Sequence, residues 1–218
     1  MVSWSGGKDS TMALYHLRET REYEIHALLT TLSEDYDRVS MHGVRRTLLE
    51  EQAKSLGYPL RKVFLAKDIS NEEYVSKMRE ALMRGKAEGV VAVAFGDIFL
   101  EDLRKFREEN LDNVGMRGVF PLWKRDTLEL ASSFIDLGFK AITTCVDSSA
   151  LGKEFVGRDF DEEFLSQLPS SVDPCGENGE FHTLVYDGPL FNKRVSHSIG
   201  EVTFRDNRFY YCDLLPQE

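Results

Sequence analysis

The sequence predicts an α/β protein, with a doubly wound, mostly parallel sheet and a smaller α+β domain at the C-terminal end. Up to about residue 124, apolar runs typical of strands alternate with amphipathic helical segments, as in a parallel sheet with helical crossovers. Residues 90–95 are apolar at every position, which is expected of a central strand covered by helices on both faces. Sheets of this kind bind their ligands at the carboxyl ends of the strands, so we expect the functional site there.

The first 124 residues are expected to contain five strands and the helices between them. The strands are expected at residues 1–4, 25–32, 60–66, 90–95 and 119–122. Helical spacing of apolar residues follows residue 11 and recurs over residues 44–56 and 74–82. Ser70 and Glu73 form a capping box that begins the last of these helices, and Gly89 follows its end.

After residue 124 the pattern starts again on a smaller scale. Asp126 with Glu129 is expected to cap a helix that ends before Gly138, and residues 140–146 and 184–186 are expected to be strands. Residues 201–204 and 209–212 flank a polar turn, which predicts a hairpin. We therefore expect two domains, residues 1–124 and residues 125–218.

Composition restricts the function classes. The 218-residue chain is 42% hydrophobic and 29% charged, which is ordinary for a globular protein with a substantial core. No apolar run approaches the roughly 18 residues of a membrane span and no leader precedes the first strand, so we expect a cytoplasmic protein without a membrane partner. The formal net charge of −10 disfavours nucleic acid and favours small molecules as partners. The three cysteines form no C-x-x-C pair, which argues against a disulfide framework or a zinc knuckle.

The most informative segment is residues 5–10, Ser-Gly-Gly-Lys-Asp-Ser, between the first strand and the first helix. Adjacent glycines let the backbone approach an anion closely, and the N-terminus of the following helix favours negative charge there. A carboxylate beside a phosphate calls for a divalent cation between them, so Asp9 implies Mg²⁺. The alternative is a glycine-rich turn that only caps the helix, but such a turn needs neither paired glycines nor a lysine.

The second informative segment is residues 173–183, Asp-Pro-Cys-Gly-Glu-Asn-Gly-Glu-Phe-His-Thr. It combines carboxylates, an amide, an imidazole and a hydroxyl with glycines that permit unusual backbone geometry. A loop this polar is costly to order without a ligand, which favours a binding role. The alternative, a solvated turn between strands, fits the composition equally well.

Residues 5–10 resemble the signature of the N-type ATP pyrophosphatases, which cleave ATP to AMP and pyrophosphate; the spacing is too tight for a G-x-x-x-x-G-K-[ST] loop. Together with residues 40–44, 95–98, 120–123 and 176–183, they occur in the order seen in the diphthine–ammonia ligase family of these proteins. This resemblance implies an adenine nucleotide alpha hydrolase-like fold, an ATP-binding domain at residues 1–124 and a substrate-binding domain at residues 125–218.

The resemblance also points to one branch of that family. Members similar to diphthine–ammonia ligase itself carry Glu-Gly-Gly-Glu, an aromatic residue and Glu-Thr, where this chain has Glu177-Asn178-Gly179-Glu180-Phe181-His182-Thr183. This version of the loop resembles a bacterial branch linked to cobalamin salvage. The acyl substrate is therefore diphthine or a cobalamin-related acid, and the two stay open.

The activity that the resemblance implies is an ATP-dependent carbon–nitrogen ligase with ATP and Mg²⁺ as cofactors. A small-molecule or protein carboxylate would be adenylated and then amidated by ammonia, which is supplied free or by a partner protein; a homodimer stays open as the assembly. The nucleotide is expected to contact Ser5, Gly6, Gly7, Lys8, Asp9, Ser10, Thr31, His42 and Gly96, and Mg²⁺ to contact Asp9 and Asp97. The substrate is expected to contact Glu177, Asn178, Gly179, Glu180, His182 and Thr183, and the catalytic set is Lys8, Asp9, Asp97, Glu177, Glu180 and His182.

Two other functions compete with this one. A tRNA-thiolating enzyme of the same pyrophosphatase group would use the same phosphate loop, but it usually needs a cysteine pair and a basic RNA-binding face, and this sequence shows neither. A nucleotide-binding regulator would need residues 5–10 but neither Asp97 nor the polar second loop. Cys175 is the one thiol in a candidate loop, and a buried bystander thiol is the favoured interpretation.

Overall fold

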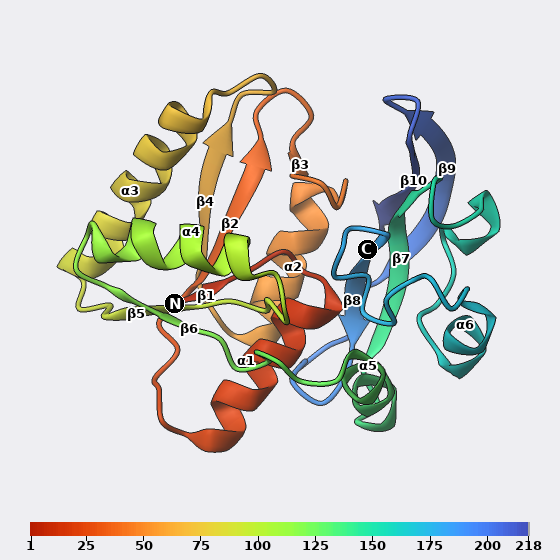
Figure 1. The fold of residues 1–218 in the computed structure, drawn as a ribbon, viewed down its shortest axis with the longest axis horizontal. Helices are drawn as coiled ribbons and strands as arrows, with labels where there is room; N and C mark the ends of the chain where they lie inside the picture. The colour runs from red at the N-terminus through yellow and green to blue at the C-terminus, as the bar shows by residue number, and fades with distance from the viewer. Residues whose placement is uncertain (218) are drawn as a thin grey trace.

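The computed structural model describes residues 1–217, which form two sheets placed side by side (Figure 1). Sheet A belongs to the first part of the chain and sheet B to the second. The chain enters sheet B after residue 124 and does not return to sheet A.

Sheet A has six strands and the topology of a doubly wound fold. They are β1 (Val2–Ser3), β2 (Leu28–Ser33), β3 (Arg38–Val39), β4 (Leu60–Leu65), β5 (Ala92–Ala94) and β6 (Arg117–Val119). Their order is β3-β2-β1-β5-β6, with β4 paired to β2, and every pair except β2–β3 is parallel. The predicted α/β class with a mostly parallel sheet is confirmed.

Four helices cover the two faces of sheet A. They are α1 (Lys8–Thr20), α2 (Arg46–Leu56), α3 (Asn71–Ala87) and α4 (Glu101–Asp112). Leu82 of α3 and Leu111 of α4 share one buried core with Val93 of the sheet. On the opposite face, Leu14 of α1 and Leu48 of α2 belong to a second, larger core. This two-sided burial explains why β5 is apolar at every position.

Sheet B is antiparallel and has the order β8-β7-β10-β9. Its strands are β7 (Lys140–Asp147), β8 (Phe181–Asp187), β9 (His197–Arg205) and β10 (Phe209–Pro216). Helix α5 (Thr127–Asp136) precedes it, and the short helices η1 (Lys153–Phe155) and α6 (Glu162–Gln167) lie between β7 and β8. Asp206 and Asn207, both with positive φ, close the predicted β9–β10 hairpin.

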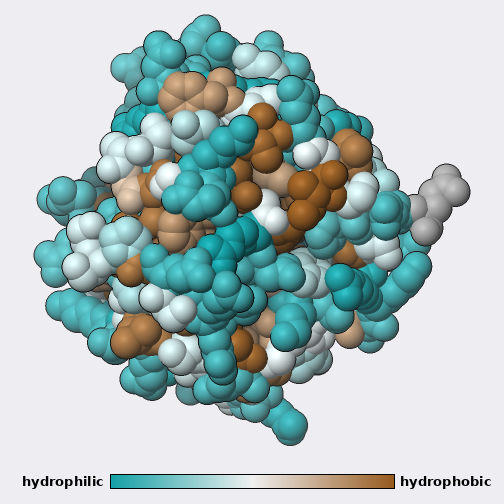
Figure 2. Space-filling model, turned by 90° about the vertical axis from the view of Figure 1, so that its right-hand side faces the viewer, coloured by the Kyte–Doolittle hydropathy of each residue, from teal (hydrophilic) through white to brown (hydrophobic). Residues whose placement is uncertain are grey.

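The two parts share a core. Helices α1 and α2 lie between the two sheets in Figure 1, and their buried residues form one cluster with Leu28 of sheet A and with Val146 and Leu184 of sheet B. The face of sheet B shown in Figure 2 is largely hydrophilic, with separate apolar areas. Because one core is continuous from the first part of the chain to the second, the domain boundary expected near residue 124 stays a prediction.

Most expected elements are present, and two strands differ in position. The Ser70–Glu73 capping box is confirmed, and Asp126 accepts from the Glu129 amide as expected. The strand expected at residues 119–122 lies instead at β6, because Pro121 has no N–H for a sheet ladder. Strand β8 begins at Phe181 and not at residue 184, so His182 and Thr183 belong to a strand and not to a loop.

Candidate active site

The loop at residues 5–10 is fixed by segments that are distant in sequence. The Gly6 carbonyl accepts from Gln52 Nε2 at 2.8 Å and from the Val185 amide at 2.9 Å, and Gln52 is fully buried. Gly6 has φ +81, and a Cβ atom there would lie 2.7 Å from Leu49 Cδ1 and 2.9 Å from Gln52 Oε1. Glycine is therefore required at this position, both for the backbone angle and for the space.

Helix α1 begins at Lys8, earlier than the sequence predicts, and a residue of sheet B caps it. Its N-cap residue, Gly7, has no side chain to bond the first amides of the helix. Thr183 of β8 supplies this bond, since its Oγ1 accepts from the Lys8 amide at 3.1 Å. Thr183 therefore has a structural role at residues 5–10, and its expected contact with the substrate stays a prediction.

Two acidic residues of sheet A approach each other at the carboxyl ends of β1 and β5. A Cβ atom at Gly96 would lie 2.7 Å from the backbone carbon of Asp9, so only glycine allows the β5 loop to touch the first turn of α1. This contact places Asp97 near Asp9. The Asp97 carboxylate is buried and pairs with Arg107 Nε at 2.7 Å. Burial raises the pKa of Asp97 against the effect of Arg107, and the charge of Asp9 raises it further.

Asp9 and Asp97 are the carboxylates that would hold Mg²⁺. In residues 1–217 no group of three or more His, Cys, Asp or Glu side chains is arranged to hold a metal ion. Magnesium is usually held by one or two carboxylates together with substrate phosphates, so Asp9 and Asp97 are a sufficient protein donor set. Their mutual repulsion at a cavity surface is what a divalent cation would relieve, and the residues therefore fit the ion.

The side chain of Lys8 contacts other protein groups, whereas its position in the motif suggests a contact with phosphate. Its Nζ donates to both Asp9 carboxylate oxygens at 2.9 Å and to the Cys175 carbonyl, and its side chain is buried. Burial would lower the pKa of this amine, but the Asp9 carboxylate keeps it raised. Lys8 therefore links the two loops through Asp9 and Cys175 before any phosphate is present.

Glu177 connects the second loop to the segment that follows β5. Its Oε1 accepts from the Ile98 amide at 2.7 Å and from the Phe99 amide at 3.3 Å, directly after Asp97. Burial raises the pKa of Glu177 to about 7, opposed by these backbone bonds and reinforced by the charges of Asp9 and Asp97. A carboxyl group in this state can change its protonation near neutral pH.

The rest of the second loop is closed by its own side chains. Asp173 Oδ1 accepts from the amides of Cys175 at 2.9 Å and Glu177 at 3.1 Å. Glu180 Oε1 accepts from the Asp173 amide at 3.1 Å and from Asn178 Nδ2 at 3.0 Å. The loop is therefore an ordered turn even without a ligand, and Glu180 and Asn178 are directed into it.

Two histidines from the two parts of the chain stack at the site. The rings of His42 and His182 have centroids 4.4 Å apart and an interplanar angle of 34°. Burial lowers the pKa of His42 to about 4, and it lowers the pKa of His182 well below the usual value. His182 Nε2 is buried and has no hydrogen-bond partner in the described residues. Both imidazoles are neutral at physiological pH, and His182 has a free ring nitrogen for a ligand.

These groups line one cavity of about 220 Å³ between the two parts. The predicted residues that line it are Ser5, Lys8, Asp9, Ser10, His42, Gly96, Asp97, Glu177, Gly179, His182 and Thr183. Side chains that sequence reasoning missed are Ser3, Phe95, Leu100, Leu103, Arg107 and Phe181. The cavity thus has a polar floor from the phosphate loop and an apolar wall from the β5–α4 region.

Five of the predicted site residues do not line the cavity. Gly6 and Gly7 shape the phosphate loop, while Asn178 and Glu180 bond within the second loop. Thr31 lies in β2, where its carbonyl accepts from the Ser40 amide at 3.4 Å.

The sequence signal for Arg107, which lines the cavity but was not predicted, is weak. A lone arginine on an exposed helix is indistinguishable by sequence from its solvated neighbours.

Cys175 has the environment of an unreactive thiol. It is buried and donates from Sγ to the Thr127 carbonyl at 3.2 Å. Burial raises the pKa of this thiol far above its usual range, so the thiolate is not populated. Cys145 and Cys212 are also buried and free, and the interpretation as bystander thiols fits all three.

The fold and this cavity define a two-part α/β protein whose parallel sheet presents an anion-binding loop to an acidic, partly apolar site. The sequence matches the Diphthamide synthase N-terminal domain over residues 1–118 and the Diphthamide synthase C-terminal domain over residues 126–213. Because these matches cover most of the chain, the protein belongs to the diphthamide synthase family.

Its relatives include three proteins named diphthine–ammonia ligase. The one from Schizosaccharomyces pombe is 28% identical over 92% of this chain and 37% of its own length. The one from Saccharomyces cerevisiae is 25% identical over 96% of this chain and 36% of its own length, and the one from Danio rerio is 28% identical over 88% and 83%. The chain spans a little over a third of the length of the two yeast relatives.

In residues 1–217 no helix is long and apolar enough to cross a membrane.

Proposed function

We propose that the protein is an ATP-dependent ligase that adenylates a substrate carboxylate and amidates it with ammonia. One observation carries this proposal: Glu177 of the second loop bonds the Ile98 amide beside Asp97, so both loops meet in one cavity. A nucleotide-binding regulator needs only the first loop. The relatives named diphthine–ammonia ligase support the same chemistry.

The first half-reaction joins the substrate to AMP. A carboxylate oxygen attacks the α-phosphorus of ATP, the bond to the β-phosphate breaks, and pyrophosphate leaves with its electron pair. Residues 5–10 would hold the leaving phosphates through the turn that Gly6 creates and through the N-terminus of α1. The apolar wall at Phe95, Leu100 and Leu103 suits the nucleoside.

Magnesium would be held by Asp9 and Asp97 together with the phosphates, where it would offset the charge that develops on the leaving group. Lys8 keeps the Asp9 carboxylate oriented in the absence of the ion. Arg107 does the same for Asp97. These two pairs hold the carboxylates in place before the nucleotide arrives, which limits the reorganisation required for catalysis.

The second half-reaction transfers the acyl group to nitrogen. Ammonia attacks the acyl carbon, AMP leaves, and the nitrogen gives up one proton. Glu177 is positioned to take this proton, and its pKa of about 7 suits a base near neutral pH. His182 can accept a hydrogen bond from neutral ammonia at its free Nε2, and as an uncharged ring it would not repel ammonium before deprotonation.

We also propose which carboxylic acid this ligase amidates. The loop of residues 177–183 resembles the version in a bacterial branch linked to cobalamin salvage, which has a histidine where diphthine–ammonia ligases carry a glutamate. Here that histidine, His182, is half-buried, neutral and packed against His42. This supports a substrate other than diphthine, with a cobalamin-related carboxylic acid as the first candidate.

The nucleotide products test the proposal. The protein is incubated with Mg-ATP, ammonium chloride and a panel of carboxylic acids that includes cobyric-type acids and a diphthine peptide, and products are separated by chromatography. AMP and pyrophosphate formed in equal amounts with an amide support the ligase. ADP as the main product, or ATP binding without turnover for every acid, would overturn it, and sulfur incorporation into tRNA would favour the thiolating alternative.

A further inference from the structure

Sheet B ends in an edge strand that has a neighbour on one side only. This strand, β9, comprises His197–Arg205 and pairs with β10 (Figure 1). Figure 1 shows it on the side of sheet B away from α1 and α2. Within residues 1–217, no backbone hydrogen bond other than those of the β10 ladder reaches residues 198–204. One row of N–H and C=O groups along this strand is therefore available to another strand.

The sequence of β9 does little to keep a second strand away. It contains neither proline nor lysine, the residues that commonly protect an edge. The side chains of Ile199 and Phe204 are 58% and 50% exposed. The register with β10 shifts between Ile199 and Val202, so regular pairing is limited to the half of the strand that follows this shift. This half presents an open and partly apolar edge.

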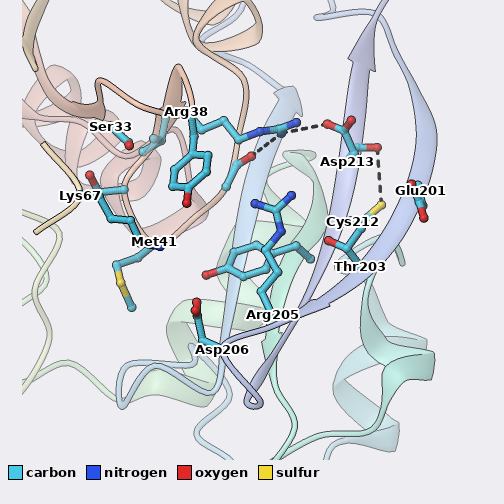
Figure 3. Close-up of a pocket in the computed structure, with 15 residues that line it drawn as sticks. Ser33, Arg38, Met41, Lys67, Glu201, Thr203, Arg205, Asp206, Cys212 and Asp213 are labelled. Carbon is cyan, nitrogen blue, oxygen red and sulfur yellow. Dashed lines mark hydrogen bonds and ion pairs between the residues drawn. The ribbon is translucent and has the colours of Figure 1, made fainter. Parts of the chain in front are cut away.

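Two opposite charges stand on one face of this edge. Glu201, Thr203 and Arg205 all line a cavity of about 260 Å³ between β9 and the first part of the chain, so their side chains project from the same face (Figure 3). The ion pairs of the neighbouring β10 belong to Asp213, and within residues 1–217 neither Glu201 nor Arg205 forms one. Arg205 lies 5.9 Å from the centroid of the Tyr211 ring and is exposed. A carboxylate and a guanidinium, four residues apart, are thus available to a partner of complementary charge.

We propose that β9 pairs in antiparallel orientation with β9 of a second copy of this chain, about a two-fold axis at Thr203. This pairing joins the two four-stranded sheets into one continuous sheet. The proposal does not depend on the ligase function, because none of its residues belongs to the candidate active site.

Backbone geometry and charge together select this register. In an antiparallel pair, opposite residues direct their N–H and C=O groups either both toward the partner strand or both away from it. Two copies of one strand therefore meet with the two-fold axis on a residue and not between residues. An axis at Glu201 or Arg205 places like charges opposite each other, which is destabilising. An axis at Val202 or Phe204 leaves both charges opposite uncharged residues.

The axis at Thr203 satisfies both the charges and the apolar side chains. It places Glu201 of each copy opposite Arg205 of the other, so the ion pair forms twice. In the same register Val202 lies opposite Phe204, also twice, and the exposed Phe204 ring gains a β-branched partner. Because both copies use the same segment, the contact closes on itself and gives a dimer, not a fibre.

Reversal of the two charges tests the proposal. Sedimentation velocity on the full chain over about 1 to 100 μM should show a dimer that dissociates on dilution. Glu201→Arg and Arg205→Glu each place like charges opposite each other twice, so each should weaken dimerisation at least about tenfold. The double variant Glu201→Arg/Arg205→Glu exchanges the charges and should restore the dimer. An equimolar mixture of the two single variants should form a mixed dimer, since each offers the charge that the other lacks.

Glu80→Arg and Arg84→Glu are the matched controls, because these residues are also exposed and four apart but lie on α3, and they should leave the dimer unchanged. A wild-type chain that stays monomeric at about 100 μM would overturn the proposal. A dimer that survives both single reversals, or one that the double reversal does not restore, would overturn it as well. Since each single variant is also tested in a mixture that should associate, a loss of folding is distinguishable from a loss of the interface.

Discussion

The two loops of the site are ordered in different ways. The phosphate loop at residues 5–10 depends on distant segments: Gln52 and Val185 bond the Gly6 carbonyl, and Thr183 caps the helix that follows. The second loop, residues 173–180, is ordered by its own Asp173 and Glu180. The first loop is held by distant segments, whereas the second is closed largely by its own side chains and reaches the carboxyl end of β5 through Glu177.

This difference separates structure from chemistry in the second loop. Four acidic or amide side chains lie within residues 173–180, and sequence alone does not separate Glu177 from Glu180, which were both predicted to be catalytic. The bonds divide them: Asp173, Asn178 and Glu180 hold the turn, and Glu177 reaches the Ile98 amide. The following variants test this division, beginning with the largest effect.

Glu177→Gln is expected to lower amide formation by about 10² to 10³, because glutamine keeps the bond from the Ile98 amide but cannot take a proton from ammonia. Glu180→Gln is the matched control. Glu180 was predicted to be catalytic, but its carboxylate bonds the Asp173 amide outside the cavity, so we expect a loss of about tenfold or less. Steady-state amide formation and ATP–pyrophosphate exchange are measured for both. Equal losses in the two variants would contradict the assignment.

Gly96→Ala tests the close approach behind the phosphate loop. The new Cβ would lie 2.7 to 2.9 Å from backbone atoms of Asp9 and Ser10, which cannot rotate away, so the free energy of unfolding should fall by about 2 kcal/mol. Mg-ATP affinity should fall as well, since Asp9 is displaced. Gly138→Ala has positive φ but open space around it, so it should cost about 1 kcal/mol and leave ATP affinity unchanged. Urea unfolding and calorimetry compare the two, and an unchanged ATP affinity in Gly96→Ala would argue against this contact.

Thr183→Val tests the cap that sheet B provides to α1. Loss of the bond from the Lys8 amide should destabilise the protein by about 1 kcal/mol. Thr143 is its register partner on β7, is fully buried, and has an Oγ1 without a hydrogen-bond partner in the described residues. Thr143→Val should therefore be neutral or stabilising. Chemical denaturation of both variants gives the comparison, and a larger loss for Thr143→Val would reverse the roles given to the two threonines.

The sequence predicted the parts of this molecule that depend on local pattern. The parallel-sheet class, the Ser70–Glu73 capping box and the hairpin closed at Asp206 follow from periodicity and turn chemistry. The start of β8 depends on a pairing partner: this strand begins at Phe181 because β7 lies beside it, and periodicity cannot reveal a neighbour.

Prediction of the site is limited in the same way, because the sequence does not reveal which groups become neighbours in the fold. Residues 5–10 and Gly96-Asp97 were predicted as one site, and all of them except Gly6 and Gly7 line one cavity, since strand ends in a parallel sheet meet at the same edge. The directions of the side chains in residues 173–183 were not predictable, because Glu180 and Glu177 differ only in which amide each one meets. Likewise, Lys8 pairs with Asp9 and Cys175 through tertiary contacts that the motif does not contain.

The smallest expected effect concerns the link between the two parts. Asp213 of β10 pairs with Arg45 and Arg38 of the first part, and hydrogen bonds from Arg45 and then Arg38 lower the pKa of Asp213 to about 2. The group has a lower pKa in the folded protein than in the unfolded chain, so its stabilisation is complete above the unfolded value near 4 and is lost as the pH falls toward 2.

Asp213→Asn should therefore lower the free energy of unfolding at pH 7 by about 1 kcal/mol or less, because the pair is partly exposed, and the difference from the wild type should shrink at pH 3. Asp37→Asn breaks the Arg46 pair within the first part, at a carboxylate that is 51% exposed, and should cost less at pH 7. Urea unfolding at the two pH values measures all three proteins. A cost for Asp213→Asn that is the same at pH 3 and pH 7 would mean that the carboxylate acts there through packing and not through its charge.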